Sequence, residues 1–513
     1  GVRSTLRAIF EIGVLSALIL ATRCANHRDV FIAGEVYFTD ADCYARMTRA
    51  RMCFEHQGLI LRHHSFENFP EGTSPHTTAP LDYLIAGLAA TLRPITSKSI
   101  DLAGAIVSPL LALFTSWFLW WWSRRRGLPY RYGLLFLFAI SPILVHGAEL
   151  GRPDHQSLLI GLIAVALCAE WNLSSGDSEK WSLVTGGAWG LALWVSLYEP
   201  LIYLAILLVA QLVFARARFL TRHRIGGWAL AAGIVLLGLL IERRLPSWPG
   251  GAGAFSNWAA TIGELSHVSI NDPVWLRWTG LLLIAFPALL WIALRKTKTL
   301  PPSLAVLLVA CFGLTVWQAR WAYFFVLLFA LTLPVCLSVL RNRFAGAILI
   351  LISCFPICQD WDERLWPNEF QAAVTAERRA DSVNWRAVAS QIEGPFLAPW
   401  WWSPAVAYWS GQPGVAGSSH EALAGIEQTA RFFLAADADT AERILRKNKA
   451  AWVVAYDAER TISNSAALLG LSPPEGALGR VLDRSPSAAP AFLQLAAQNA
   501  SCKLFRVHLF QEK

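Results

Sequence analysis

Long apolar stretches dominate residues 1–359, and short polar segments separate them. Each stretch runs for roughly 16 to 21 residues, about the length that a helix needs to cross the hydrocarbon of a bilayer. The pattern therefore predicts a membrane α-helical fold with about 11 transmembrane helices. The stretches begin near residues 8, 102, 132, 157, 181, 200, 227, 275, 302, 321 and 344.

The composition excludes an ordinary soluble protein. Apolar residues make up 55% of the chain, charged residues only 16%, and 24 residues are tryptophan. Such a composition is typical of an integral, multi-pass membrane protein whose outer surface contacts membrane lipids.

Lysine and arginine residues fall in every second linker between the apolar stretches. Such linkers stay on the cytoplasmic side of a membrane, so we predict a cytoplasmic N-terminus and an extracytoplasmic C-terminal region, as on the periplasmic side of a bacterial inner membrane. The net charge of +8 is mostly this topology signal, and no basic and aromatic stripe accompanies it, so we expect no nucleic-acid partner. The predicted outer segments are residues 23–101, 148–156, 196–200, 242–274, 318–320 and those after about 359.

The pattern changes after the last apolar stretch, because charged residues, proline and serine become frequent. We predict two domains: a transmembrane domain over 1–359, with a large first outer loop over about 23–101, and an extracytoplasmic mixed α/β domain over 360–513. The predicted elements of the second domain are strands over 394–402, 450–456 and 503–509, and helices over 421–434 and 438–447.

Asp40 and Asp42 lie two residues apart in the first outer loop. Two carboxylates at this spacing can both bind one hard divalent cation through oxygen. Acidic residues are also favoured at a helix N-terminus without any metal, and an Asp-x-Asp pair in a polar loop is often simply solvated. The apolar residues that follow predict that the pair starts a helix lying on or near the membrane.

The second outer loop is short and polar. Asp154, His155 and Gln156 are candidate metal ligands there, because charges at the mouth of a transmembrane helix are costly unless they are paired or functional. The alternative is an Arg152–Asp154 pair at the level of the lipid headgroups.

Two further charged residues occur at predicted outer helix ends. Glu264 is flanked by apolar residues, and an ordinary acidic residue at a helix N-terminus is the simpler alternative for it. Arg320 starts a span from the outer side, against the positive-inside bias. A bound anion such as phosphate explains this arginine better than a side chain that reaches up to the headgroups.

Four motifs in this order resemble those of the oligosaccharyltransferase catalytic subunit, in its single-subunit bacterial and archaeal forms, within the GT-C group of membrane glycosyltransferases. Their order, spacing and predicted membrane side all agree with that family over most of the chain. The matching residues are Asp40 with Tyr44 and Arg46, then Asp154-His155-Gln156, then Thr261-Ile262-Gly263-Glu264, and then Arg320-Trp321-Ala322-Tyr323.

The chain departs from that family at two places. The family's Trp-Trp-Asp-Tyr-Gly signature resembles a pocket for the serine or threonine of an acceptor sequon. At its position this chain has Trp400-Trp401-Trp402-Ser403-Pro404-Ala405. Only the tryptophans remain, so the family's transfer to peptide asparagine does not follow from the resemblance. Gln156 stands where the family has histidine or glutamate.

The resemblance implies an inverting, metal-dependent glycosyltransferase with a GT-C fold and a polyprenyl-phosphate or polyprenyl-pyrophosphate sugar donor. It implies that protein or glycan acceptors are modified on the outer face of the membrane. The implied roles are Mg or Mn ligation by Asp40, Asp42, Asp154, His155 and Gln156, donor phosphate binding by Arg320 and Arg152, catalysis by Asp40 and Glu264, and acceptor binding by Trp401, Trp402 and Ser403.

Two other classes of protein compete with the glycosyltransferase. A transporter or flippase of a lipid-linked glycan also needs charge within its membrane domain, but it predicts interrupted helices near the middle of the bilayer, whereas these charges gather at one surface. A noncatalytic scaffold leaves the four ionisable motifs without a role.

Overall fold

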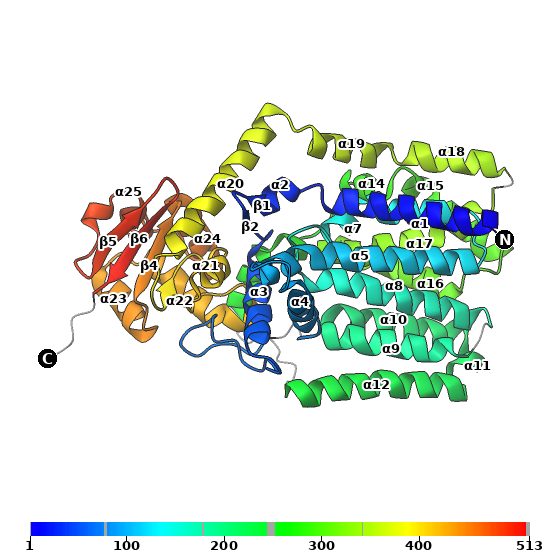
Figure 1. The fold of residues 1–513 in the computed structure, drawn as a ribbon, viewed down its shortest axis with the longest axis horizontal. Coiled ribbons are helices and arrows are strands. Elements are labelled where there is room, and N and C mark those ends of the chain that lie inside the picture. Colours follow the sequence, from blue (N-terminus) through cyan, green and yellow to red (C-terminus); the bar gives the residue numbers. More distant parts are fainter. Residues whose placement is uncertain (1, 76–78, 177–178, 244–251, 341, 509–513) are drawn as a thin grey trace. The chain divides into compact units, whose positions relative to one another are not determined.

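The computed structural model describes residues 2–75, 79–176, 179–243, 252–340 and 342–508. The chain divides into two compact units, shown by their elements in Figure 1. The first unit comprises residues 1–28, 105–241 and 264–368, and the second comprises residues 29–104, 242–263 and 369–513. Helix α5 (Ser99–Arg125) begins in the second unit and continues into the first.

The first unit is a bundle of helices around one large apolar core (Figure 1). Helix α17 is buried along its whole length, because apolar side chains cover it all round and helices on every side can pack against them. Besides part of α5, the helices of this unit are α1 (Val2–Arg23), α6 (Arg131–Ile140), α7 (Pro142–His146), α8 (His155–Ser174), α9 (Trp181–Val195), α10 (Tyr198–Phe214), α11 (Arg216–Phe219), α12 (Arg222–Glu242), α14 (Val274–Thr279), α15 (Leu282–Lys296), α16 (Pro302–Trp317), α17 (Ala322–Leu337), α18 (Arg343–Ser353) and α19 (Phe355–Leu365), with 3-10 turns η1 (Gly263–Leu265) and η2 (Ala319–Trp321).

Each predicted apolar stretch is helical, but the number of spans is not confirmed. In the described part of the chain, six helices are long and apolar enough to cross a membrane: Ser4–Arg23, Ser99–Arg125, His155–Ser174, Arg222–Glu242, Ala319–Leu337 and Arg343–Leu365. Helices α9, α10 and α16 are apolar but shorter than 18 residues. These features agree with an integral, multi-pass membrane protein.

Breaks within two predicted stretches have local causes. Pro142 begins α7 directly after α6 ends, because a proline nitrogen cannot continue the hydrogen bonding of the preceding helix. Gly280 separates α14 from α15 with φ of 84°, and a Cβ atom there would lie 2.5 Å from the carbonyl oxygen of Ser353. Ser353 instead accepts the backbone N–H of Leu281 at 2.9 Å, so the break is part of the packing.

The second unit contains a four-stranded mixed sheet in the order β3-β4-β6-β5. Strand β3 pairs with β4 in parallel, and β6 pairs with β4 and with β5 in antiparallel. The strands are β1 (Phe31–Ile32) and β2 (Glu35–Val36), which form a separate hairpin, and β3 (Phe396–Leu397), β4 (Trp452–Tyr456), β5 (Leu493–Gln498) and β6 (Cys502–Val507). The helices are α3 (Ala41–Glu55), α4 (Ala79–Leu92), α13 (Ala252–Ala260), α20 (Glu369–Ala389), α21 (Ser403–Ser410), α22 (Leu423–Leu434), α23 (Ala438–Lys447), α24 (Ala458–Leu469) and α25 (Leu478–Arg484), with α2 (His27–Val30) at the boundary between the units and short turns η3 (His420–Ala422) and η4 (Pro486–Ala488).

The C-terminal sheet confirms the predicted mixed α/β character, although some elements differ. The strand predicted over 394–402 is wrong beyond Leu397, because the chain turns at Pro399 and Pro404 then opens α21 at a position where its missing N–H costs nothing. The prediction also omitted β5, which is mostly exposed, and α20, which carries too many polar residues for a strong apolar pattern. The domain boundary at residue 360 stays a prediction.

Candidate functional site

A tightly held loop leads from α7 to α8 in the first unit. The backbone N–H of Leu150 donates to the carbonyl of Arg23 at 2.8 Å, and the side-chain amide of Asn26 donates to the carbonyl of Leu150 at 2.8 Å. The N–H of Gly151 donates to the carbonyl of Ala105 at 2.9 Å. Because three neighbouring segments bind the backbone here, the side chains that follow are presented in one fixed arrangement.

Asp154 ends this loop as the N-cap of α8. Its carboxylate Oδ1 accepts the backbone N–H of His155 at 2.7 Å and lies 2.7 Å from the Nδ1 atom of the same histidine. An N-cap carboxylate is fixed both by this hydrogen bond and by the positive end of the helix dipole. Asp154 and His155 are therefore held together at the mouth of a candidate membrane span.

Arg152 contacts two carboxylates of the same unit. Its Nη2 atom lies 3.1 Å from Oε1 of Glu264 and 3.9 Å from Oδ2 of Asp154, and its side chain is only 8% exposed. The predicted Arg152–Asp154 pair is thus the longer of the two contacts, and Glu264 is the closer partner.

The same arginine defines a directed chain of hydrogen bonds. Arg152 Nη1 donates to Nε2 of His146 at 3.3 Å, since a guanidinium has only donors. His146 must then carry its proton on Nδ1, which lies 2.9 Å from the Tyr323 hydroxyl. That hydroxyl donates in turn to Oε1 of Glu264 at 3.4 Å. Tyr323 and Arg152 therefore both orient the carboxylate of Glu264.

Arg320 pairs with Glu199, which lies in the first turn of α10. The Nη2 atom of Arg320 lies 2.7 Å from Oε1 of Glu199, and the glutamate side chain is almost fully buried at the start of α10. Ser196 Oγ donates to Oε2 of Glu199 at 2.8 Å, and Gln156 Nε2 lies 3.4 Å from Oε1. The amide of Gln156, predicted as a metal ligand, contacts Glu199 and lies 3.4 Å from Nε2 of His155.

These side chains gather at one end of the first unit, where α7 ends and where α8, α10 and α17 begin. We call them the polar cluster of the first unit. Its members are His146, Arg152, Asp154, His155, Gln156, Ser196, Glu199, Glu264, Arg320 and Tyr323. Five of the predicted site residues therefore share one polar network with Glu264, although they come from distant parts of the sequence.

The other predicted acidic pair lies in the second unit. Asp40 is the N-cap of α3, and its Oδ1 accepts the backbone N–H of Cys43 at 2.9 Å, while Asp42 lies in the first turn. The predicted helix start is confirmed. Farther along α3, Arg46 and Arg49 lie 2.7 and 3.4 Å from the buried carboxylate of Asp82 on α4.

His64 and Glu67 form a buried pair in the same unit. Histidines in loops are more often exposed to solvent, so this burial is unusual. His64 Nε2 lies 4.0 Å from Oε2 of Glu67, and both side chains are almost completely buried. Burial raises the pKa of Glu67 to about 7, and the negative charges of Asp42 and Glu421 also raise it, while Arg49 opposes them. Burial lowers the pKa of His64 well below its usual value, so this histidine is neutral.

The predicted acceptor residues are largely engaged in packing. Trp402 stacks on Trp385 with ring centres 4.8 Å apart, and Ser403 is buried and donates its hydroxyl to the carbonyl of Ala416 at 2.7 Å. Trp401 is half-buried and lies beneath the guanidinium of Arg460, 5.3 Å from the ring centre. Trp401 and Trp402 therefore both keep a partly exposed surface, and Trp401 also has a cationic neighbour.

Carboxylate, imidazole and amide side chains that can bind a divalent cation are present among the predicted site residues. Among the described residues, no group of three or more histidine, cysteine, aspartate or glutamate side chains is arranged to hold a metal ion. Asp40 and Asp42 belong to the second unit, whereas Asp154 and His155 belong to the first. A carboxylate pair in one unit and a carboxylate with an imidazole in the other suit Mg or Mn chemically, and ligation by all of them stays a prediction.

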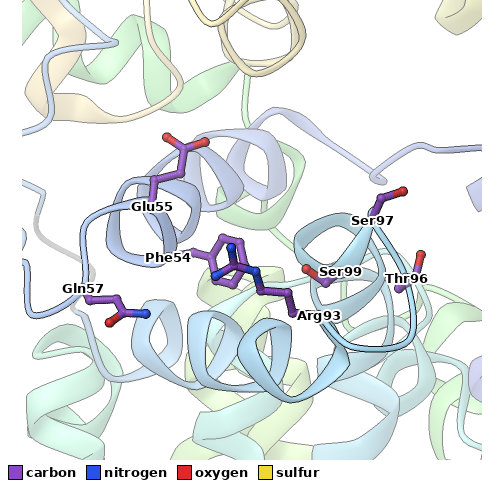
Figure 2. Close-up of a pocket in the computed structure, with 7 residues that line it drawn as sticks. All are labelled: Phe54, Glu55, Gln57, Arg93, Thr96, Ser97 and Ser99. Carbon is purple, nitrogen blue, oxygen red and sulfur yellow. The ribbon is translucent and has the colours of Figure 1, made fainter.

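A pocket of about 760 Å³ opens elsewhere in the second unit, at the end of α3 (Figure 2). Phe54, Glu55 and Arg93 line it together with polar residues of the segment that follows α4. None of its lining residues was predicted as a site residue, so it is separate from the motifs described above.

No protein-family model matches this chain, and no curated protein sequence matches it. Solved structures do. The archaeal oligosaccharyltransferase AglB from Archaeoglobus fulgidus, in complex with an inhibitory peptide and a dolichol-phosphate, superposes with a TM-score of 0.69 at 15% identity, over 91% of this chain and 71% of AglB. ArnT from Cupriavidus metallidurans, bound to undecaprenyl phosphate, superposes with a TM-score of 0.61 at 13% identity, over 98% of each chain.

A further structure of the A. fulgidus enzyme, in complex with Zn and sulfate, gives a TM-score of 0.64 at 16% identity, over 87% of this chain and 67% of that one. At these identities the similarity shows the fold. It is the fold of the GT-C membrane glycosyltransferases, and the predicted resemblance to an oligosaccharyltransferase is confirmed at that level.

Proposed function

We propose that this chain is an inverting GT-C glycosyltransferase that moves a sugar or oligosaccharide from a polyprenyl-linked phosphate donor to an acceptor on the outer face of the membrane. The observation that carries the proposal is the polar cluster of the first unit, in which two arginines and three carboxylates are held at one end of apolar helices. Charges in such a setting are costly and are retained for ionic substrates or catalysis.

Each group has a distinct task in the proposed reaction. Arg320 and Arg152 bind the donor phosphate, since a guanidinium matches phosphate oxygens. Glu264, oriented by Tyr323 and Arg152, accepts the proton of the acceptor nucleophile, with Asp40 as a second group that orients it. The nucleophile bonds to the anomeric carbon as the bond from that carbon to the phosphate oxygen breaks, and the polyprenyl phosphate or pyrophosphate leaves.

A divalent cation completes the proposed site. Asp40, Asp42, Asp154, His155 and Gln156 supply its ligands. When bound, a Mg or Mn ion neutralises the charge that develops on the leaving phosphate oxygen.

The ligands of the similar structures support a lipid-linked donor. Those structures were solved with a dolichol-phosphate and with undecaprenyl phosphate, which are both polyprenyl phosphates. An acceptor peptide is present in one oligosaccharyltransferase structure. In this chain Ser403 is buried and hydrogen-bonded to the backbone, so we propose that Trp401 and Trp402 bind a protein or glycan acceptor by surface contact.

Transfer assays with purified protein test the proposal. The protein is incubated with a lipid-linked sugar, Mn²⁺ and candidate protein, glycan or lipid acceptors, and compared with Asp40→Ala and Glu264→Gln. We expect transfer by the wild type and loss in both variants, whereas Glu459→Gln, at an exposed ion pair with Arg480, should keep full activity. Activity in both site variants would overturn the assigned roles.

The same variants separate transfer from transport. Movement of the lipid-linked sugar across liposomes is measured with the wild type and with Glu264→Gln. Rapid movement that is equal in both, without sugar transfer, identifies a flippase and contradicts the proposed enzyme.

A further inference from the structure

Glu199 forms an ion pair with the guanidinium of Arg320, the arginine that is proposed to bind the donor phosphate. The 2.7 Å contact joins a carboxylate with a 1% exposed side chain to a guanidinium with a 20% exposed side chain. Three side chains hold Glu199 in place, since Ser196 and Gln156 also bind its carboxylate. Part of the arginine therefore stays accessible, while a buried negative charge beside it offsets its positive charge.

The charge balance of the polar cluster continues this pattern. Arg152 is likewise paired, with Glu264 at 3.1 Å, and Asp154 lies 3.9 Å from the same arginine. Two arginines thus face three carboxylates, so the charges of both arginines are already offset within the cluster.

This balance favours a donor with little charge of its own. A sugar linked through one phosphate carries a single negative charge, whereas one linked through pyrophosphate carries at least one more. Each added negative charge close to Glu199 meets like-charge repulsion, which is strong where water is excluded. A bound divalent cation contributes the same charge with either donor, so it does not remove the difference.

We propose that Glu199 is a specificity-determining residue that adapts this site to a polyprenyl monophosphate donor and against a polyprenyl pyrophosphate donor. The inference rests on the proposed function, because it assigns the donor class at the same site. Glu199 acts through Arg320 and does not contact the reacting atoms.

A matched ion pair within the same bundle provides the control. Glu170 on α8 binds Arg224 of α12 with both carboxylate oxygens, at 2.9 and 2.8 Å, and is as deeply buried as Glu199. Glu170 lies at the opposite end of α8 from Asp154. The variant Glu170→Gln therefore removes a buried carboxylate from an arginine in the same fold but away from the proposed donor site.

The experiment compares the binding of polyprenyl monophosphate and polyprenyl pyrophosphate of equal chain length to the full-length protein, at a fixed Mg²⁺ concentration. For the wild type we expect the monophosphate to bind about tenfold more tightly. Glu199→Gln keeps the shape of the side chain and removes its charge, and it should shift the ratio of the two dissociation constants toward pyrophosphate by about tenfold, on the scale of one pair of neighbouring charges. Glu170→Gln should leave the ratio at its wild-type value.

Two results overturn the inference: tighter binding of pyrophosphate by the wild type, or an unchanged ratio in Glu199→Gln. If Glu199→Gln does not fold, tighter binding of pyrophosphate by the wild type still overturns the inference. Transfer from sugar-linked forms of both lipids separates this inference from the proposed function. Transfer only from the pyrophosphate donor contradicts the inference alone, whereas transfer from neither contradicts the proposed function.

Discussion

Replacing Tyr323 by phenylalanine removes one oxygen atom from the centre of the polar cluster. That hydroxyl lies 2.9 Å from Nδ1 of His146 and donates to Glu264 at 3.4 Å. Without it, the part-buried His146 loses the hydrogen bond of its Nδ1 atom to Tyr323, and Glu264 loses a group that orients it. The variant therefore tests whether the hydrogen-bond chain serves the chemistry.

The structure sets the size of both effects. A hydrogen bond to a charged group contributes about 1.5 to 3 kcal/mol, and the 3.4 Å contact is long, so we take the lower value, about tenfold in kcat/KM. Loss of the hydrogen bond between Tyr323 and His146 should lower the free energy of unfolding by about 1 kcal/mol. Tyr323→Phe should therefore be folded, somewhat less stable and clearly less active.

A second buried tyrosine in the same bundle gives the control. Tyr203 donates its hydroxyl to Sγ of Cys311 at 2.9 Å and stacks on Trp321, outside the polar cluster. Transfer from a lipid-linked sugar and thermal unfolding are measured for the wild type, Tyr323→Phe and Tyr203→Phe. Wild-type kcat/KM in Tyr323→Phe, or an equal loss of activity in both variants, would refute the positioning role of Tyr323.

Three further outcomes follow from other buried groups. Glu170→Gln breaks the bidentate pair with Arg224 and should lower the free energy of unfolding by about 3 kcal/mol, whereas replacing both residues by leucine and methionine should restore most of it; chemical unfolding in detergent checks both. Asp40→Asn keeps a capping acceptor for α3 and loses the charge, so it should unfold within about 0.5 kcal/mol of the wild type yet lose transfer activity, and a large loss of stability would show that the charge serves folding instead. Burial raises the pKa of Glu67 to about 7, so between about pH 4.5 and pH 7 the folded state keeps a proton that the unfolded state has released. The free energy of unfolding should therefore fall by about 3 kcal/mol as the pH rises from about 4.5 to about 7. Unfolding midpoints measured for Glu67→Gln should lack this pH dependence.

The apolar pattern predicted the helices of the first unit well, because a stretch that must be apolar on most sides leaves a strong signal. It failed where helices are short or broken, since Gly280 and Pro142 interrupt the backbone without changing the hydrophobicity around them. The short apolar helix α4 was absorbed into the predicted first outer loop for a related reason, because its 14 residues fall below the length expected of a span.

Most residues of the candidate site were predictable from the sequence, but its two shortest arginine–carboxylate contacts were not. Charged residues at helix ends identified Asp154, Glu264 and Arg320, yet the partner of Arg320 proved to be Glu199, which is separated from it by more than one hundred residues. Nothing in the sequence pattern connects α10 to α17, and only the packing of the bundle brings these helix starts together. His146 was missed because a single histidine at the end of an apolar stretch gives no spacing signal.

The ion pair between Glu170 and Arg224 differs from the ion pairs of the polar cluster in how fully its charged groups are enclosed. The first fits a role in stability, and the second fit a role in the proposed reaction. Both carboxylate oxygens of Glu170 bind Arg224, and the side-chain amide of Gln211 also donates to Oε2 of Glu170 at 2.6 Å. The side chains of Glu170 and Arg224 are both less than one-tenth exposed. These contacts join α8, α10 and α12. In the polar cluster, Glu264 and Arg320 keep 34% and 20% of their side chains exposed. A purely structural pair gains nothing from this exposure, whereas a site that must exchange protein partners for a phosphate and a nucleophile requires it.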